Sequence, residues 1–145
     1  MQRALIAAVI AVFSATILQA GAAEVPKRKP GLWEITTVAA ATGMTTSTVC
    51  IGPDDRIATP EDSGDCSEPT ARSVGSEIFV DVVCKKKFGK QIMSTAFSGD
   101  FNSRYHAIMK ITFDPPEGVP NMGVIIDGKY LGPDCSAPGP QEPKQ

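Results

Sequence analysis

The sequence has few of the residues on which enzymes and nucleic-acid-binding proteins depend. It contains one histidine in 145 residues, and 14 basic residues stand against 16 acidic ones, for a net charge of −2. A chain without a dense basic face is a poor candidate for wrapping nucleic acid. Its four cysteines form no C-x-x-C pair, so the sequence indicates neither a zinc site nor a redox dithiol. We therefore expect no nucleic-acid partner, no metal and no cofactor.

Catalytic motifs are also missing. Neither G-x-S-x-G nor H-E-x-x-H occurs in the sequence. His106 is the only side chain that titrates near neutral pH without a perturbed pKa. It alternates onto the same strand face as Arg104 and Lys110, so we expect it on a solvated surface. The protein is expected to be non-enzymatic, and a hydrolase that uses Ser, Asp or His106 is kept as an alternative.

Long apolar runs are absent from the chain after residue 23, but one occurs before it. Arg3 precedes an apolar run over residues 4–18, and the small residues at 20–22 fit an A-x-A cleavage pattern. This order predicts a secretory signal peptide over residues 1–23, cleaved after Ala22 or Ala23. An uncleaved anchor is the alternative, because residues 4–23 are long enough to span a bilayer. The mature chain is expected to be exported, without a transmembrane segment, and to begin with a flexible lead-in at residues 24–30.

The four cysteines all lie in the mature part, at Cys50, Cys66, Cys84 and Cys135. An even number in an exported chain predicts disulfides, for which three pairings exist. The turn signal at residues 73–76 predicts a hairpin centred near residues 74 and 75, which sets position 66 opposite 83 or 84. Opposite residues are close enough to be bridged, so we expect Cys66–Cys84 and, by elimination, Cys50–Cys135. A redox-active role is the alternative to this structural one.

Thirteen glycines and twelve prolines separate short segments with a period of two. The alternation is clearest in residues 104–113, where Tyr105, Ala107, Met109, Ile111 and Phe113 share one face. We predict a single all-β domain over residues 31–135, an antiparallel meander forming a curved sheet, sandwich or barrel-like, of about seven strands. The expected strands cover residues 31–38, 44–51, 66–72, 77–84, 90–99, 104–113 and 122–131.

Two further elements complete the expected domain. Residues 53–59 are predicted to form one short helix, because Pro53 suits a helix start and Asp54 and Asp55 suit its first turn. Residues 136–145 contain three prolines and no apolar cluster, and are expected to be a disordered tail.

The candidate binding residues are aromatic or sulfur-containing. Trp33, the only tryptophan, and the dry-face residues Tyr105, Met109 and Phe113 could fill the core or line a ligand pocket. Core filling is the simpler interpretation of all four residues. Both interpretations are open from the sequence.

A second candidate is a basic run formed by Lys85, Lys86, Lys87 and Lys90. It could contact anionic lipid headgroups or another polyanion, or it could be a charged hairpin end that keeps a strand soluble. The carboxylates between residues 54 and 65 lack the order of a calcium loop, so we interpret them as a solvated loop.

Several short motifs occur together along the mature chain. K-P-G-L-W-E-I-T stands at residues 29–36, S-G-D-F at 98–101 and G-K-Y-L-G-P-D-C at 128–135. With the cysteines at 50, 66 and 84, these motifs resemble the domain of unknown function 3617 family over about residues 29–135. The resemblance implies a small exported protein of Gram-negative bacteria with a periplasmic location. It supplies no catalytic residue, cofactor or substrate.

The leading functional hypothesis is therefore a non-enzymatic periplasmic β-domain that binds a small apolar ligand or an envelope partner. A structural or stress-related envelope protein is the alternative. A cavity of several hundred cubic ångströms lined by Trp33 or Phe113 would favour a ligand, and a filled interior would favour a partner surface.

Overall fold

The structure is a computed structural model that describes residues 21–59, 63–87, 89–115 and 121–136. Most of the predicted signal segment and all but the first residue of the predicted tail lie outside these residues. No helix within them is long and apolar enough to cross a membrane. The described elements are β1 (Gly21–Ala22), β2 (Gly31–Ala39), β3 (Gly43–Ile51), the 3₁₀ helix η1 (Ser63–Asp65), β4 (Thr70–Val74), β5 (Glu77–Lys86), β6 (Gly89–Gly99), β7 (Arg104–Asp114) and β8 (Asn121–Gly132).

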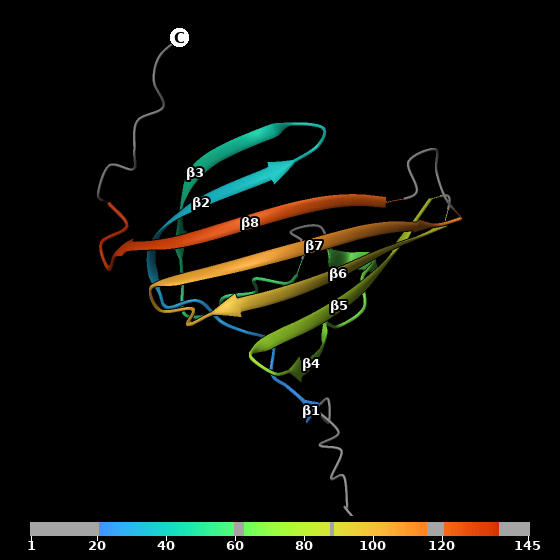
Figure 1. The fold of residues 1–145 in the computed structure, drawn as a ribbon, viewed down its shortest axis with the longest axis horizontal. Helices are drawn as coiled ribbons and strands as arrows, with labels where there is room; N and C mark the ends of the chain where they lie inside the picture. The colour runs from blue at the N-terminus through green and yellow to red at the C-terminus, as the bar shows by residue number, and fades with distance from the viewer. Residues whose placement is uncertain (1–20, 60–62, 88, 116–120, 137–145) are drawn as a thin grey trace, which may run out of the picture.

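All the strands belong to one twisted, open, antiparallel sheet (Figure 1) with the order β1-β4-β5-β6-β7-β8-β2-β3. Strands β4 to β8 follow one another as a meander, and β4 and β5 are joined by the two-residue turn Gly75–Ser76, with Gly75 at φ 61°. Strand β8 then pairs with β2, so that the β2–β3 hairpin forms the far side of the sheet. The predicted all-β class is confirmed, and the strand count exceeds the expected seven only by the two-residue β1.

Side chains alternate between two faces of the sheet. On β7, Tyr105 and Ala107 are buried, whereas Ile108 between Ala107 and Met109 is 53% exposed. We call the face that carries Tyr105 the inner face and the opposite one the outer face. The dry and wet sides predicted for this strand are therefore present.

The core lies on the inner face, near the start of β2. Six buried side chains form it: Trp33, Ile51, Val80, Phe97, Tyr105 and Ala107. Two segments pack over them. Val25 comes from the lead-in before β2, and Ile57 and Ala58 come from the connection after β3. A single sheet thus obtains a closed core because irregular chain covers part of one face.

The predicted helix at residues 53–59 is wrong. The segment folds as successive turns, in which the Thr59 amide donates to the Arg56 carbonyl at 3.0 Å. Its acidic residue Asp55 binds Arg28 instead of stabilising a helix start. Seven residues are too few to form a stable helix without tertiary support, and here the tertiary contacts favour an irregular segment.

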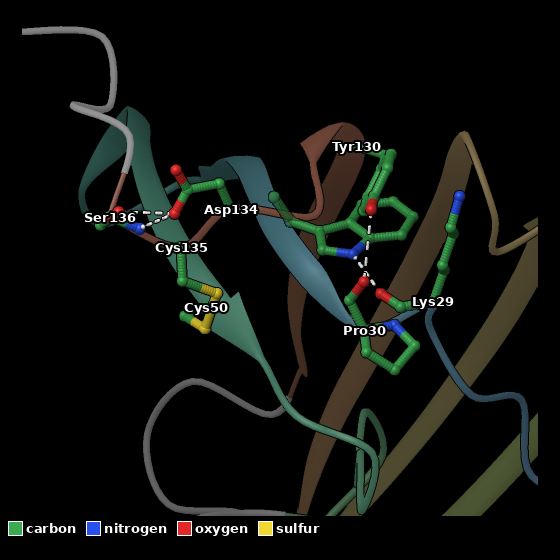
Figure 2. The surroundings of a disulfide bond; sticks show 8 residues. Lys29, Pro30, Cys50, Tyr130, Asp134, Cys135 and Ser136 are labelled. Carbon is green, nitrogen blue, oxygen red and sulfur yellow. Dashed lines mark hydrogen bonds between the residues drawn. A yellow bond between two sulfur atoms is a disulfide. The ribbon is translucent and has the colours of Figure 1, made fainter.

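The disulfides are Cys50–Cys135 and Cys66–Cys84, the two pairs that the hairpin register predicts. Cys50–Cys135 ties β3 to the segment after β8 (Figure 2), across 85 residues of sequence. Cys66 lies opposite Cys84 in an isolated bridge, and the neighbouring Ser67 amide donates to the Val83 carbonyl at 2.8 Å. The second disulfide therefore holds the chain before β4 against β5.

Candidate functional site

An aromatic cluster occupies the inner face where β2 begins and β8 ends. The Trp33 ring lies 5.7 Å from that of Tyr105 and 5.5 Å from that of Tyr130, and Phe101 stacks on Tyr105 at 5.9 Å. The Trp33 indole N–H donates to the Lys29 carbonyl at 2.8 Å. Trp33 is fully buried and Tyr105 is 4% exposed. The structure therefore places these two pocket candidates among core contacts, with no free ring face.

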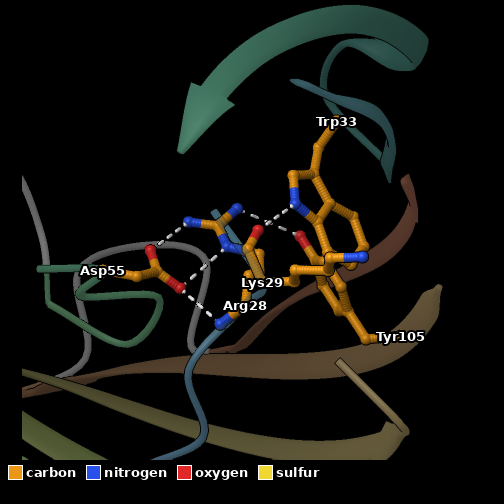
Figure 3. A network of polar contacts seen from close by, with 5 residues as sticks. All are labelled: Arg28, Lys29, Trp33, Asp55 and Tyr105. Atoms are coloured by element: carbon orange, nitrogen blue, oxygen red, sulfur yellow. Dashed lines mark hydrogen bonds and ion pairs between the residues drawn. The ribbon is translucent and has the colours of Figure 1, made fainter. Parts of the chain in front are cut away.

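An ion pair fastens the lead-in beside this cluster (Figure 3). The Arg28 guanidinium donates to both carboxylate oxygens of Asp55, at 2.7 and 3.1 Å, and the Arg28 amide donates to the same carboxylate at 2.8 Å. Only 13% of the Arg28 side chain and 4% of the Asp55 side chain are exposed. Burial alone would lower the pKa of Arg28, but the hydrogen bond and charge of Asp55 raise it above its ordinary value. The pair was not anticipated from the sequence, from which residues 24–30 were expected to be a flexible lead-in.

Replacing Asp55 with asparagine is expected to lower the free energy of unfolding by about 3 kcal/mol, because a charged Arg28 would be left in a largely dry site. Urea unfolding followed by Trp33 fluorescence measures this loss. The matched control is Asp127→Asn, which breaks the His106–Asp127 pair, whose side chains are 45% and 58% exposed. That variant should lose less than about 1 kcal/mol, and equal losses in the two variants would contradict the account.

The rest of the inner face holds an apolar depression. Two cavities, of about 150 and 370 Å³, lie on it. The residues that line the two cavities are neighbours on adjacent strands, because Met93 is opposite Ile111 and Met109 is opposite Val124. We call this surface the apolar trough and define it by six side chains that share the inner face: Ala39, Met93, Met109, Ile111, Met122 and Val124.

The side chains that line the trough are uncharged and mostly apolar. None of the described residues that line either cavity is charged, and the polar ones are Thr59, Thr95 and Asn121. Three of the six trough side chains are methionines, which are flexible and polarisable and adapt to different apolar shapes. Of the four pocket candidates, Met109 lines one of these two cavities and Tyr105 borders a separate cavity of about 360 Å³. Phe113 lies half-buried on the inner face, opposite Gln91.

A polar groove of about 360 Å³ lies on the outer face, at the end near Gly99 and Arg104. The register places Ser98, His106 and Asp127 in one row across β6, β7 and β8. The His106 Nδ1 atom lies 2.7 Å from an Asp127 carboxylate oxygen. Among the described residues, Asp127 is the one hydrogen-bond partner of the His106 ring. His106 is half-exposed, as expected of a surface residue.

Two of the four lysines of the basic run, Lys85 and Lys90, line one cavity of about 490 Å³, which also includes Asp65. Lys85 and Lys90 are opposite each other in the β5–β6 hairpin and, by alternation, point to the outer face, whereas Lys86 falls on the inner-face side. Lys90 is also opposite Asp114 of β7. Lys85, Lys86 and Lys87 are all exposed. The arrangement agrees with a charged hairpin end. Separately, the described residues contain no group of His, Cys, Asp or Glu that could hold a metal ion.

Asp100 organises the β6–β7 connection beside the aromatic cluster. Its carboxylate accepts hydrogen bonds from the Ser103 hydroxyl at 2.6 Å and from the backbone amides of Ser103, Arg104 and Asn102. These bonds hold the pKa of Asp100 well below its ordinary value. The same turn places the Ser103 carbonyl where it accepts a hydrogen bond from the Tyr130 amide at 2.9 Å.

The free energy of unfolding is expected to fall as the pH is lowered below about 4, the ordinary pKa of an aspartate. The contribution of Asp100 is complete above that pH, because its pKa is depressed in the folded state, and it is lost as the pH falls toward the folded value. Urea unfolding at about pH 6 and about pH 3 should show a smaller loss in Asp100→Asn than in the wild type. An equal loss in both proteins would show that this turn does not set the acid sensitivity.

A comparison with known protein families finds one family that matches most of this domain. The model of a family described as "Protein of unknown function (DUF3617)" matches residues 28–135. The matched range begins at Arg28 of the buried ion pair and ends at Cys135 of the long-range disulfide. No curated protein and no solved structure matches the chain.

Proposed function

Because the chain belongs to the DUF3617 family, whose function is unknown, we propose a function from the structure alone: the protein is a non-enzymatic binding protein that holds a small apolar ligand in the apolar trough. The polar groove is the competing site, but His106 and Asp127 are both solvated, and within the described residues no hydroxyl group hydrogen-bonds to the His106 ring. The observation that carries the proposal is the apolar trough, whose two cavities have no charged side chain among the described residues that line them.

The contrast between the two halves of the inner face supports this assignment. At the start of β2, Val25, Ile57 and Ala58 pack against the core, and the Trp33 indole N–H donates to the Lys29 carbonyl. At the other end, Met122 is 37% exposed, and Ile111 and Val124 are half-buried around a cavity of about 370 Å³. Contiguous exposed apolar surface marks binding sites in monomeric proteins, and ligand pockets have volumes of about 300–1,000 Å³.

The lining of the trough sets the class of ligand. The described residues that line the trough offer no charged side chain to compensate a buried ionic group, and burying an unpaired charge is costly. The ligand is therefore a hydrocarbon chain or another uncharged apolar molecule, with at most a polar end near Asn121. Binding would gain free energy from apolar area removed from water, about 25 cal/mol per Å².

We also propose that the protein acts in an oxidising compartment outside the cytoplasm, the periplasm. Two disulfides and no free cysteine among the described residues support this location. Cleavage after Ala22 or Ala23 would remove β1, whose two residues pair with Arg72 and Ser73 at the edge of the sheet. The core and the trough lie downstream of both cleavage sites.

Native mass spectrometry of the protein exported with its own leader tests both parts of the proposal. The expected mass is that of a chain beginning at Ala23 or Glu24 with two disulfides. Incubation with a long-chain fatty alcohol and with the corresponding fatty acid should give a one-to-one complex, at least as stable for the uncharged alcohol. Absence of any complex with either molecule would overturn the binding function, and an unprocessed mass would overturn the export.

A further inference from the structure

Strand β3 is an edge strand without the usual protection. It is the last strand in the sheet order, and its pairing with β2 runs without interruption from Gly31 opposite Ile51 to Ala39 opposite Gly43. Every residue from Gly43 to Cys50 is exposed. The nine residues include no charged side chain and no proline. Such an edge presents unpaired backbone N–H and C=O groups to another strand.

The opposite edge of the sheet is protected. Strand β4 has five residues, carries Arg72 and follows Glu68 and Pro69. The short β1 also pairs with it. Short length, charge and proline are the devices by which proteins prevent edge-to-edge association. Their presence at one edge and absence from the other singles out β3 as the side on which the sheet can be extended.

We propose that β3 pairs antiparallel with β3 of a second copy of the chain, about a twofold axis at Thr46, which lies near the middle of the exposed stretch of the strand. Residues that lie opposite each other in an antiparallel pair point to the same face of the sheet. A twofold axis between two copies of one strand must therefore pass through a residue that lies opposite itself. Thr46 then faces its symmetry mate and Met44 faces Thr48 on the outer face, while Thr45 faces Ser47 on the inner face. The Cys50–Cys135 corner lies outside the paired stretch.

The chemistry of β3 favours a second copy as the partner. All of these pairs are uncharged, so no like charges oppose each other when the strand meets itself. The β-branched threonines of the strand suit a pleated cross-strand pair. A net charge of −2 per chain adds little long-range repulsion between two copies.

An apolar row on the outer face points to the same edge. Phe79, Ala96, Ile108, Ile125, Val38 and Met44 are successive register partners from β5 to β3. The row ends at Met44, which is 73% exposed, the highest value among the exposed large hydrophobic side chains of the described chain. In the proposed dimer, Met44 packs beside Thr48 of the second copy, and the two rows flank the axis.

Sedimentation equilibrium of the purified, disulfide-bonded protein over a range of concentrations tests the proposal. The wild type should show a mass twice that of one chain at high concentration. Thr46→Lys, which sets two lysines opposite each other, should shift the protein to a monomer, while Ser76→Lys, with the same charge change in the exposed β4–β5 turn, should not. A wild type that stays monomeric, or a dimer that persists in Thr46→Lys, would overturn the proposal.

A cross-link tests the register independently of any loss of folding. Thr46→Cys should form a disulfide-linked dimer under mild oxidation, with peptide mapping showing position 46 joined to itself. Ser76→Cys should remain unlinked under the same conditions. Failure of Thr46→Cys to link, with Trp33 fluorescence unchanged from the wild type, would contradict pairing about this residue.

Discussion

Replacing Gly128 with alanine is expected to lower the free energy of unfolding by at least about 3 kcal/mol, the upper end of the usual cost of overpacking a core. Gly128 on β8 lies opposite Tyr105 on β7, and the tyrosine ring covers the glycine. A Cβ built on Gly128 would overlap that ring, with Cζ at 2.6 Å and Cε1 and Cδ1 closer still. The ring would have to leave its position between Trp33 and Phe101, and the Arg28 contact would go with it.

The control for this substitution is Gly123→Ala in the same strand. A Cβ at Gly123 would meet nothing within 4 Å, and its backbone is not in the left-handed region. That variant should be as stable as the wild type or slightly more stable, because alanine reduces the conformational entropy of the unfolded chain. Urea unfolding of both variants measures the difference. Similar stabilities would contradict the role of the Tyr105 contact in the core.

Removing the Cys50–Cys135 disulfide by a Cys50→Ala and Cys135→Ala double substitution is expected to cost about 4 to 5 kcal/mol in the chain-entropy model. The disulfide joins residues 85 positions apart and fastens the edge strand β3 to the segment after β8. Both cysteines are exposed, so the alanines leave no cavity in the core. The measurement is the midpoint and slope of urea unfolding under non-reducing conditions.

The corresponding control is the Cys66→Ala and Cys84→Ala double variant. Its loop spans only 18 positions, so the entropic loss is smaller, about 3 kcal/mol. Cys84 is 1% exposed, however, and its replacement also removes packing in the buried side of β5. A Cys50–Cys135 variant that unfolds at the wild-type urea concentration would show that β3 is held by its pairing with β2 alone.

The elements governed by local sequence were predictable. The alternation in residues 104–113 predicted β7 and its buried face, and the turn signal at 73–76 predicted the hairpin that sets Cys66 beside Cys84. These features depend on a period of two and on turn chemistry, both of which act over a few residues. Strand bounds for this reason differ from the predicted ones by only a few positions.

The features that depend on distant contacts were not predictable. Asp55 looked like a residue of a helix start, and its partner Arg28 is 27 positions away. For Trp33 the sequence favoured core filling over a pocket, but only the folded chain shows that the Tyr105 and Tyr130 rings pack against it. The pairing of β8 with β2, which brings Val124 beside Ala39 in the apolar trough, likewise leaves no local signal.

The central claim, that the apolar trough binds the ligand, is tested most directly by two lysine substitutions at adjacent positions of β8. Val124 lines the trough on the inner face, whereas its neighbour Ile125 points to the outer face and is 40% exposed. The measurement is the affinity for N-phenyl-1-naphthylamine, an uncharged apolar dye, by fluorescence titration. We predict saturable binding to the wild type and to Ile125→Lys, and binding at least about tenfold weaker to Val124→Lys, a difference of about 1.4 kcal/mol. Equal affinities in the two variants, or no saturable binding to the wild type, would contradict the account.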